Sequence, residues 1–122
     1  MREIPLTKGY VAFVDDEDFD RVAQFKWTAT ITSRGTKVYA VRKTRKHEKE
    51  RWKSQKIRLH HWVLDIAPSE LPPGYVVDHF NDNGLDCRKT INERSQLQII
   101  TQEANMAKVP TWRANKKVEC FL

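Results

Sequence analysis

The sequence of 122 residues contains no long apolar run, no apolar N-terminal segment and only two cysteines. A membrane-spanning helix needs about 20 consecutive apolar residues, so none is predicted. The N-terminus lacks the apolar stretch and the small-residue cleavage site of a secretory signal, and we therefore expect a cytoplasmic protein. Cys87 and Cys120 lie far apart and neither belongs to a Cys-x-x-Cys pair. This spacing argues against a structural zinc site and against a disulfide framework.

Charged and aromatic residues, in contrast, are plentiful. The chain has 22 Lys plus Arg against 16 Asp plus Glu, a net charge of +6, and its four Trp, three Tyr and five Phe can fill a core. A chain of this length buries roughly two-thirds of its unfolded surface, which suffices for one core. No internal repeat or linker divides the sequence, so we expect one domain that comprises residues 1–122.

Most of the positive charge lies between Arg42 and Arg58. This segment holds nine basic and two acidic residues, a net of +7, so the rest of the chain sums to −1. We predict a long loop or a flexible hairpin tip here. A solvated surface segment is the usual fate of such a run, and binding of nucleic-acid phosphates is the functional alternative. The candidate phosphate-binding residues are Arg42, Lys43, Arg45, Lys46, Lys49, Arg51, Lys53, Lys56, Arg58 and, elsewhere in the chain, Arg88, Arg113 and Lys116.

The first half of the sequence predicts mainly strands. Residues 10–14 are β-rich, and the acidic run at 15–20 precedes apolar residues spaced as on one face of a short helix. Acidic groups favour a helix N-terminus, so we interpret this run as an N-cap and first turn rather than as a metal site. Residues 26–32 and 37–42 flank a Gly-containing turn and predict a hairpin. Residues 57–64 predict a strand or a short helix.

The last third of the sequence predicts strand, loop, strand and helix. Residues 75–80 form the first β-rich run, and the Asn-Asp-Asn-Gly sequence at 81–84 must turn the chain, since these residues tolerate left-handed conformations. Residues 97–100 are the second run. Residues 101–108 are good helix formers behind a capping Thr.

Three residues in this last third suit the binding of a divalent cation and the transfer of a proton. Asp78 and His79 are adjacent where a strand meets a turn, and Asn105 lies on the helix. Mg²⁺ prefers carboxylate and amide oxygens and keeps positions open for water and phosphate. A neutral imidazole can accept a proton from a water that attacks phosphorus. Adjacent strand residues point to opposite faces, so the strand end must twist or bulge to bring both groups to one phosphate.

The sequence around these residues resembles the HNH nuclease motif, in the form common in phage and mobile-intron homing endonucleases. The resemblance lies in GYVVDHFNDNGLDCRK at 74–89 and LQIITQEAN at 97–105. The upstream matches are Ile4-Pro5-Leu6-Thr7, Val14-Asp15-Asp16-Glu17-Asp18, Lys26-Trp27, Tyr39-Ala40-Val41-Arg42 and Leu59-His60. The resemblance thus covers roughly residues 4 to 108.

This resemblance implies an α+β protein with a ββα-metal (HNH) motif over 74–108, in which Asp78 and Asn105 bind the metal and His79 is the general base. The family places an Asn just before the second strand, where its side chain orients the catalytic His. Gln96 occupies that place here, and Asn92 is the alternative if the longer loop inserts after it. Cys87 replaces a further Asn of the family's turn.

The resemblance also implies the activity and its partners. We expect a DNA endonuclease or nickase that uses one Mg²⁺ or Mn²⁺ per site and is encoded by a phage, a plasmid or a prokaryote. The β-rich half at 1–66 and the basic tail at 109–122 would contact DNA. Because one HNH site cuts one strand, double-strand cleavage requires a homodimer or sequential nicks. A non-catalytic DNA-binding module with a decayed site is the alternative, and RNA stays open as a substrate.

Four aromatic residues outside the motif are expected to have structural roles. The resemblance matches His60, for which we expect a structural or hydrogen-bonding role. Trp27, Trp62 and Tyr39 are expected in the core rather than on a base-stacking surface.

Overall fold

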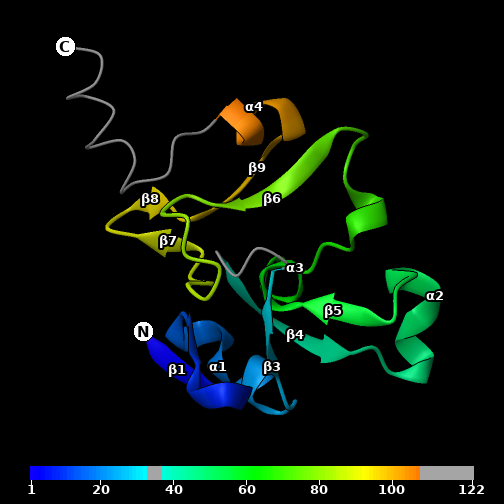
Figure 1. Ribbon diagram of the computed structural model, residues 1–122, viewed down its shortest axis with the longest axis vertical. Coiled ribbons are helices and arrows are strands. Elements are labelled where there is room, and N and C mark those ends of the chain that lie inside the picture. The colour runs from blue at the N-terminus through cyan, green and yellow to red at the C-terminus, as the bar shows by residue number, and fades with distance from the viewer. Residues whose placement is uncertain (33–36, 108–122) are drawn as a thin grey trace.

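The computed structural model describes residues 1–32 and 37–107 and has a mixed α+β architecture (Figure 1). In chain order the elements are β1 (Arg2–Pro5), η1 (Thr7–Gly9), β2 (Val11–Val14), α1 (Asp16–Ala23), β3 (Thr28–Ile31), β4 (Val38–Lys43), η2 (Lys46–Glu48), α2 (Lys49–Trp52), β5 (Lys56–Arg58), α3 (Leu59–Leu64), η3 (Pro68–Glu70), β6 (Tyr75–His79), β7 (Thr90–Ile91), β8 (Arg94–Ser95), β9 (Leu97–Thr101) and α4 (Gln102–Ala107). Within these residues no helix is long and apolar enough to cross a bilayer.

The N-terminal unit is a hairpin covered by a short helix. β1, which the sequence did not predict, pairs antiparallel with β2, and Ala12 and Val14 of β2 are fully buried. α1 begins after Asp15, as expected, but the side chain of Asp15 does not cap it. The carboxylate instead accepts the backbone N–H of Lys89 at 2.8 Å. The acidic run therefore ties α1 to the C-terminal part of the chain.

A three-stranded antiparallel sheet, in the order β3-β4-β5, forms the middle of the molecule. The predicted hairpin is confirmed as β3 and β4. The predicted hairpin tip over the basic segment is confirmed in part, since β4 and β5 pair antiparallel around it. The connection contains η2 and α2, so it is not a long loop. The Glu48 carboxylate explains the turn: it accepts hydrogen bonds from the Arg42 guanidinium at 2.8 and 2.7 Å and from the backbone N–H of Arg45 at 2.9 Å. These bonds close the chain into its first helical turn.

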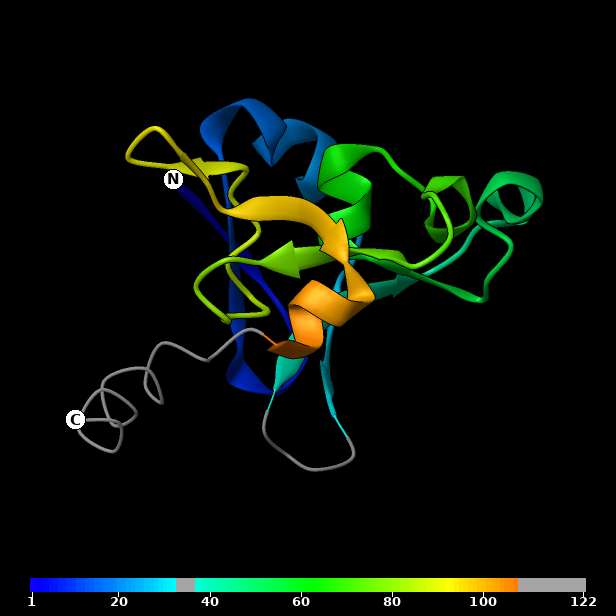
Figure 2. The same cartoon turned by 90° about the horizontal axis from the view of Figure 1, so that it is seen from above.

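The C-terminal unit is two antiparallel strands followed by a helix (Figure 2). Asp78 of β6 lies opposite Gln98 of β9, and His79 lies opposite Leu97. The predicted cap of α4 is confirmed, since the backbone N–H of Ala104 donates to Thr101 Oγ1 at 3.0 Å. The extra residues between the strands form the small hairpin β7–β8.

The loop after β6 is fastened to both other units. The Phe13 N–H donates to the Leu85 carbonyl at 2.8 Å, and the Cys87 N–H donates to the Phe13 carbonyl at 2.7 Å. Gly84 lies so close to β4 that a Cβ there would stand 2.3 Å from the Val38 carbonyl oxygen. Only glycine allows this approach. One core cluster spans these units and includes Ile4, Val14, Val22, Trp27, Leu59, Val63, Val77 and Leu97.

Candidate functional site

Three residues predicted to form the site line one hollow of about 620 Å³. Asp78 and His79 reach it from the end of β6, and Asn105 reaches it from α4. We call it the β6 hollow; its other lining residues include Tyr39, Arg58, His60 and Asp82. Asp78 and His79 both line it although they are consecutive, because β6 ends at His79 and the chain then turns.

The donors around Asp78 fit a hard cation. Asp78 is 8% exposed, and its Oδ2 accepts a hydrogen bond from Gln98 Nε2 at 2.8 Å. Gln98 is its partner across the two strands, so the strand register orients the carboxylate. Asn105, whose side chain carries an amide, lines the same hollow. A carboxylate and an amide beside space for water and phosphate are the ligand set that Mg²⁺ or Mn²⁺ requires.

His79 is 5% exposed and is held among aromatic rings and a thiol. Its ring centroid lies 4.7 Å from that of His60 and 5.8 Å from that of Tyr39. The Sγ atom of Cys87 lies 3.8 Å from His79 Nε2. Burial raises the pKa of the Cys87 thiol, which therefore stays protonated. These contacts hold the imidazole in one place at the hollow.

His60 lies behind His79 as a buried, neutral ring. Burial lowers the pKa of His60 well below its usual value, and the neighbouring His79 and His61 add to this effect. Tyr39, predicted in the core, is half-buried and lines the hollow instead, with its ring 5.8 Å from that of His60. Trp27 is in the core, as predicted. Trp62 is partly buried and packs against this core cluster.

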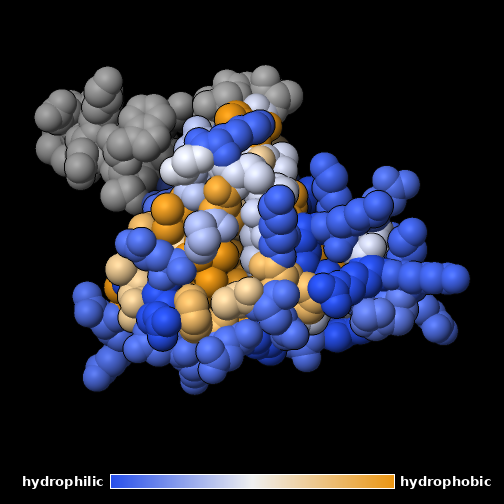
Figure 3. Space-filling model, turned by 90° about the horizontal axis from the view of Figure 1, so that it is seen from below, coloured by the Kyte–Doolittle hydropathy of each residue, from blue (hydrophilic) through white to orange (hydrophobic). Residues whose placement is uncertain are grey.

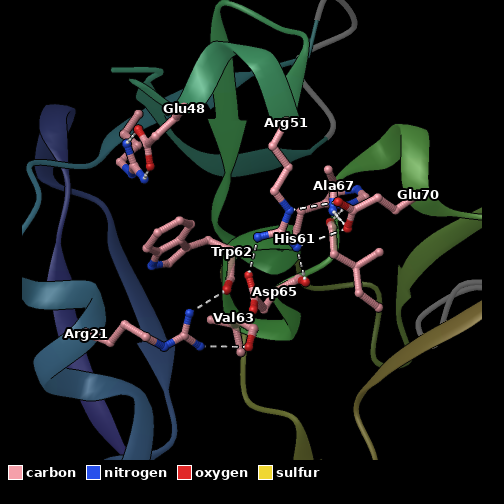
Figure 4. A network of polar contacts seen from close by, with 11 residues as sticks. Arg21, Glu48, Arg51, His61, Trp62, Val63, Asp65, Ala67 and Glu70 are labelled. Carbon is pink, nitrogen blue, oxygen red and sulfur yellow. Dashed lines mark hydrogen bonds and ion pairs between the residues drawn. The ribbon is translucent and has the colours of Figure 1, made fainter. Parts of the chain in front are cut away.

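The helix α3, which carries His60, is fixed by hydrogen bonds at its C-terminal end (Figure 4). The Arg21 guanidinium donates to the carbonyls of Trp62 and Val63, both at 2.8 Å. His61 Nδ1 lies 2.9 Å from the Ile66 carbonyl oxygen. The bonds from Arg21 reach two carbonyls in the last turn of α3, and they fix this end of the helix that carries His60.

Gln96 joins the two ends of the loop that follows β6. It is 2% exposed, and its Nε2 donates to Asn81 Oδ1 at 2.7 Å and to the Asp86 carbonyl at 3.2 Å. Its Oε1 accepts the Asn81 N–H at 3.3 Å. Asn92 lies exposed in the β7–β8 turn with a φ of 50°. Of the two predicted residues, Gln96 is therefore the one positioned to shape the loop next to His79.

Three of the predicted phosphate-binding residues make ion pairs within the protein. Arg42 is 3% exposed and pairs with buried Glu48. Arg51 pairs with Asp65 at 2.8 Å and with Glu70 at 2.7 Å, and Arg88 pairs with Asp86 at 2.7 Å. Arg42, buried against Glu48, is therefore not placed to bind a phosphate, whereas the assignment of Arg51 and Arg88 to phosphates stays a prediction. Besides Arg51, seven basic residues of the segment are exposed: Lys43, Arg45, Lys46, Lys49, Lys53, Lys56 and Arg58. Arg113 and Lys116 lie outside the described residues.

A cluster of Asp15, Glu17 and Asp18 offers a second group of carboxylates. The Lys89 ammonium lies 2.6 Å from Glu17 and 3.3 Å from Asp18. Lys89, together with Arg21, which lies 3.3 Å from Asp18, balances part of the charge of this acidic cluster.

Three neighbours of the site, Asp82, Gln98 and Tyr39, were not predicted from the sequence. Asp82 stands in the turn already identified, and Gln98 follows from pairing the two predicted strands around Asp78. Tyr39 reaches the hollow from β4, a contact that no local pattern reveals. A scan against protein-family models found no match, and searches of the curated proteins and of the solved structures found none either.

Proposed function

We propose that this protein is a divalent-metal-dependent endonuclease or nickase that hydrolyses phosphodiester bonds of DNA, with a ββα-metal site of the HNH type. The observation that carries the proposal is the convergence of Asp78 and His79 from the end of β6 and of Asn105 from α4 on one hollow. A carboxylate, an imidazole and an amide around one hollow are groups that metal-assisted phosphodiester hydrolysis uses.

In this proposal each residue has one task. Asp78 and Asn105 hold the cation, with Gln98 fixing the orientation of the Asp78 carboxylate. When bound, Mg²⁺ or Mn²⁺ supplies Lewis-acid stabilisation of the charge that develops on the phosphate and on the departing 3′ oxygen. His79 accepts the proton of the attacking water, and the rings of His60 and Tyr39 keep its imidazole in place.

The DNA backbone reaches the site along the face of the sheet. A second hollow of about 530 Å³, which we call the β5 hollow, shares Thr30, Val41, Arg58, His61 and Pro68 with the β6 hollow. Its own lining adds Lys56, which stands directly opposite Lys43. Like charges at directly opposed positions of neighbouring strands are destabilising, and a phosphate between them removes that cost. Lys43, Lys56 and Arg58 thus lead from the edge of the sheet to Asp78.

A non-catalytic DNA-binding module is the second candidate, because a Gln stands where the family has an Asn. The experiment that separates the two is incubation of supercoiled plasmid with the protein and Mg²⁺ or Mn²⁺, with and without a chelator. Nicked circles that form with metal and disappear with chelator support the nuclease. Retarded but intact plasmid under both conditions supports the binding module.

A further inference from the structure

A third hollow lies where β4 leaves the sheet, between the end of α1 and the η2–α2 turn. It has a volume of about 680 Å³, and we call it the basic hollow. Its lining residues are Phe25, Lys26, Arg42, Lys43, Thr44, Arg45, Lys46 and Lys49. Six of these eight are basic and none is acidic. Figure 3 shows this side of the molecule, where strongly hydrophilic side chains crowd the part that contains α2.

The charge of the basic hollow is not balanced by the protein. Arg42 is neutralised by Glu48. For the other five basic side chains, no ion pair to a carboxylate exists within residues 1–32 and 37–107. The guanidinium of Arg45 lies 4.5 Å above the Phe25 ring, which holds its position. Five uncompensated positive charges around one hollow repel each other and attract an anion.

One residue of the lining, Thr44, carries a buried hydroxyl without a partner among the described residues. Thr44 is 3% exposed, and in the described part of the chain its Oγ1 has no hydrogen-bond partner. A buried hydroxyl without a partner costs free energy, so such groups are rare unless something else binds them. A phosphate oxygen is an acceptor for this hydroxyl as well as a counter-charge for the lysines.

We propose that the basic hollow binds a backbone phosphate of duplex DNA, at a distance from the phosphate that is cleaved. The choice of DNA as the ligand rests on the proposed function. β4 connects the two places: Tyr39 and Val41 line the β6 hollow, and Arg42 and Lys43 line the basic hollow. Tyr39 and Lys43 are about 13 Å apart along the strand. This distance is well under the ~34 Å turn of a duplex, so phosphates of one DNA molecule reach both hollows.

The test compares two charge-matched variants in binding to a short labelled duplex. The first, Lys26→Gln with Lys49→Gln, removes two charges from the basic hollow. The second, Arg2→Gln with Lys8→Gln, removes two exposed charges that lie outside the lining of this hollow and outside the basic segment. Fluorescence anisotropy is measured with chelator at several salt concentrations, so that cleavage plays no part.

We expect the first variant to weaken binding about tenfold or more, and the slope of log K against log salt to fall by about 0.9 for each lost phosphate contact. The second variant should bind nearly as wild type does. Equal losses in both variants, or no loss in the first, would overturn the proposal. A wild-type protein that binds no duplex would also overturn the proposal. The same holds if inorganic phosphate at physiological concentration weakens duplex binding by wild type as much as the first variant does, since the hollow would then be a site for free phosphate.

Thr44→Val provides the second measurement, because it removes the hydroxyl and keeps the charge and shape. Since the hydroxyl has no partner in the described structure, this variant should fold with undiminished stability but bind the duplex several-fold more weakly. Unchanged affinity would remove Thr44 from the site. The binding measurements are independent of cleavage. If wild type does not nick plasmid but the Lys26→Gln, Lys49→Gln variant loses affinity, only the nuclease proposal is refuted. If wild type nicks plasmid but this variant keeps its affinity, only the phosphate site is refuted.

Discussion

Glu48→Gln tests whether Arg42 is a structural residue rather than a DNA contact. Both side chains are buried, at 3% and 8% exposure, and two hydrogen bonds of 2.8 and 2.7 Å join them. The hydrogen bonds from Arg42 lower the pKa of Glu48 from 4.5 to about 2, against the opposing effect of burial. At about 1.4 kcal/mol for each pKa unit, this shift corresponds to a stabilisation of about 3 kcal/mol. Removing one partner of a buried ion pair typically lowers the free energy of unfolding by about 3–5 kcal/mol, which agrees with this value.

The sign of the pH dependence follows from the lowered pKa. The stabilisation by the Glu48 charge is present in full above about pH 4.5 and is lost as the pH falls toward 2, where the folded protein also takes up the proton. Urea unfolding followed by tryptophan fluorescence should therefore show Glu48→Gln about 3 kcal/mol less stable than wild type at pH 7, and the gap should narrow by about 2 kcal/mol at pH 3.

The matched control is Glu50→Gln, since Glu50 is exposed two residues away and makes no ion pair in the described part of the chain. Its stability should change by no more than about 0.5 kcal/mol. A Glu48→Gln protein that loses under 1 kcal/mol, or that shows the same gap at both pH values, would refute the buried pair. Arg42 would then be available to bind DNA.

Three further predictions concern the site itself. Asp78→Ala and Asn105→Ala should each weaken Mn²⁺ binding in a calorimetric titration, and unchanged affinity in both would locate any metal elsewhere. Gln96→Ala should slow plasmid nicking, because it distorts the loop beside His79, whereas Asn92→Ala should not. Slow nicking by Asn92→Ala with normal nicking by Gln96→Ala would contradict the role given to Gln96. Gly84→Ala should destabilise the protein by about 1–3 kcal/mol in urea unfolding, because the new Cβ meets a backbone oxygen at 2.3 Å, and a neutral result would mean that the loop lies farther from β4.

The sequence predicts the elements whose signals are local. The hairpin β3–β4 follows from two β-rich runs around a turn, and the cap of α4 follows from Thr101. The order of strand, loop, strand and helix around Asp78 was predictable for the same reason. Each of these depends on residues only a few positions apart.

The features that the sequence analysis missed depend on distant or competing partners. Asp15 stands where an N-cap stands, but its carboxylate binds the backbone of Lys89, which is 74 positions away. The basic segment looks like a solvated loop by composition, and only the burial of Glu48 against Arg42 turns it into helical turns. Tyr39 has the character of a core residue, and only the contacts of its ring with those of His60 and His79 show that it belongs to the hollow.

The single-turnover rate of plasmid nicking by His79→Ala, measured together with duplex affinity, tests the central claim most directly. A general base acts in the transition state and contributes little to backbone binding, so the rate should fall about 10²–10⁴-fold while the affinity stays nearly unchanged. His47→Ala, which changes an exposed histidine of the basic segment, is the matched control and should nick at the wild-type rate. A His79→Ala protein that nicks as fast as wild type would contradict the account, since the imidazole at the β6 hollow would then take no part in the reaction.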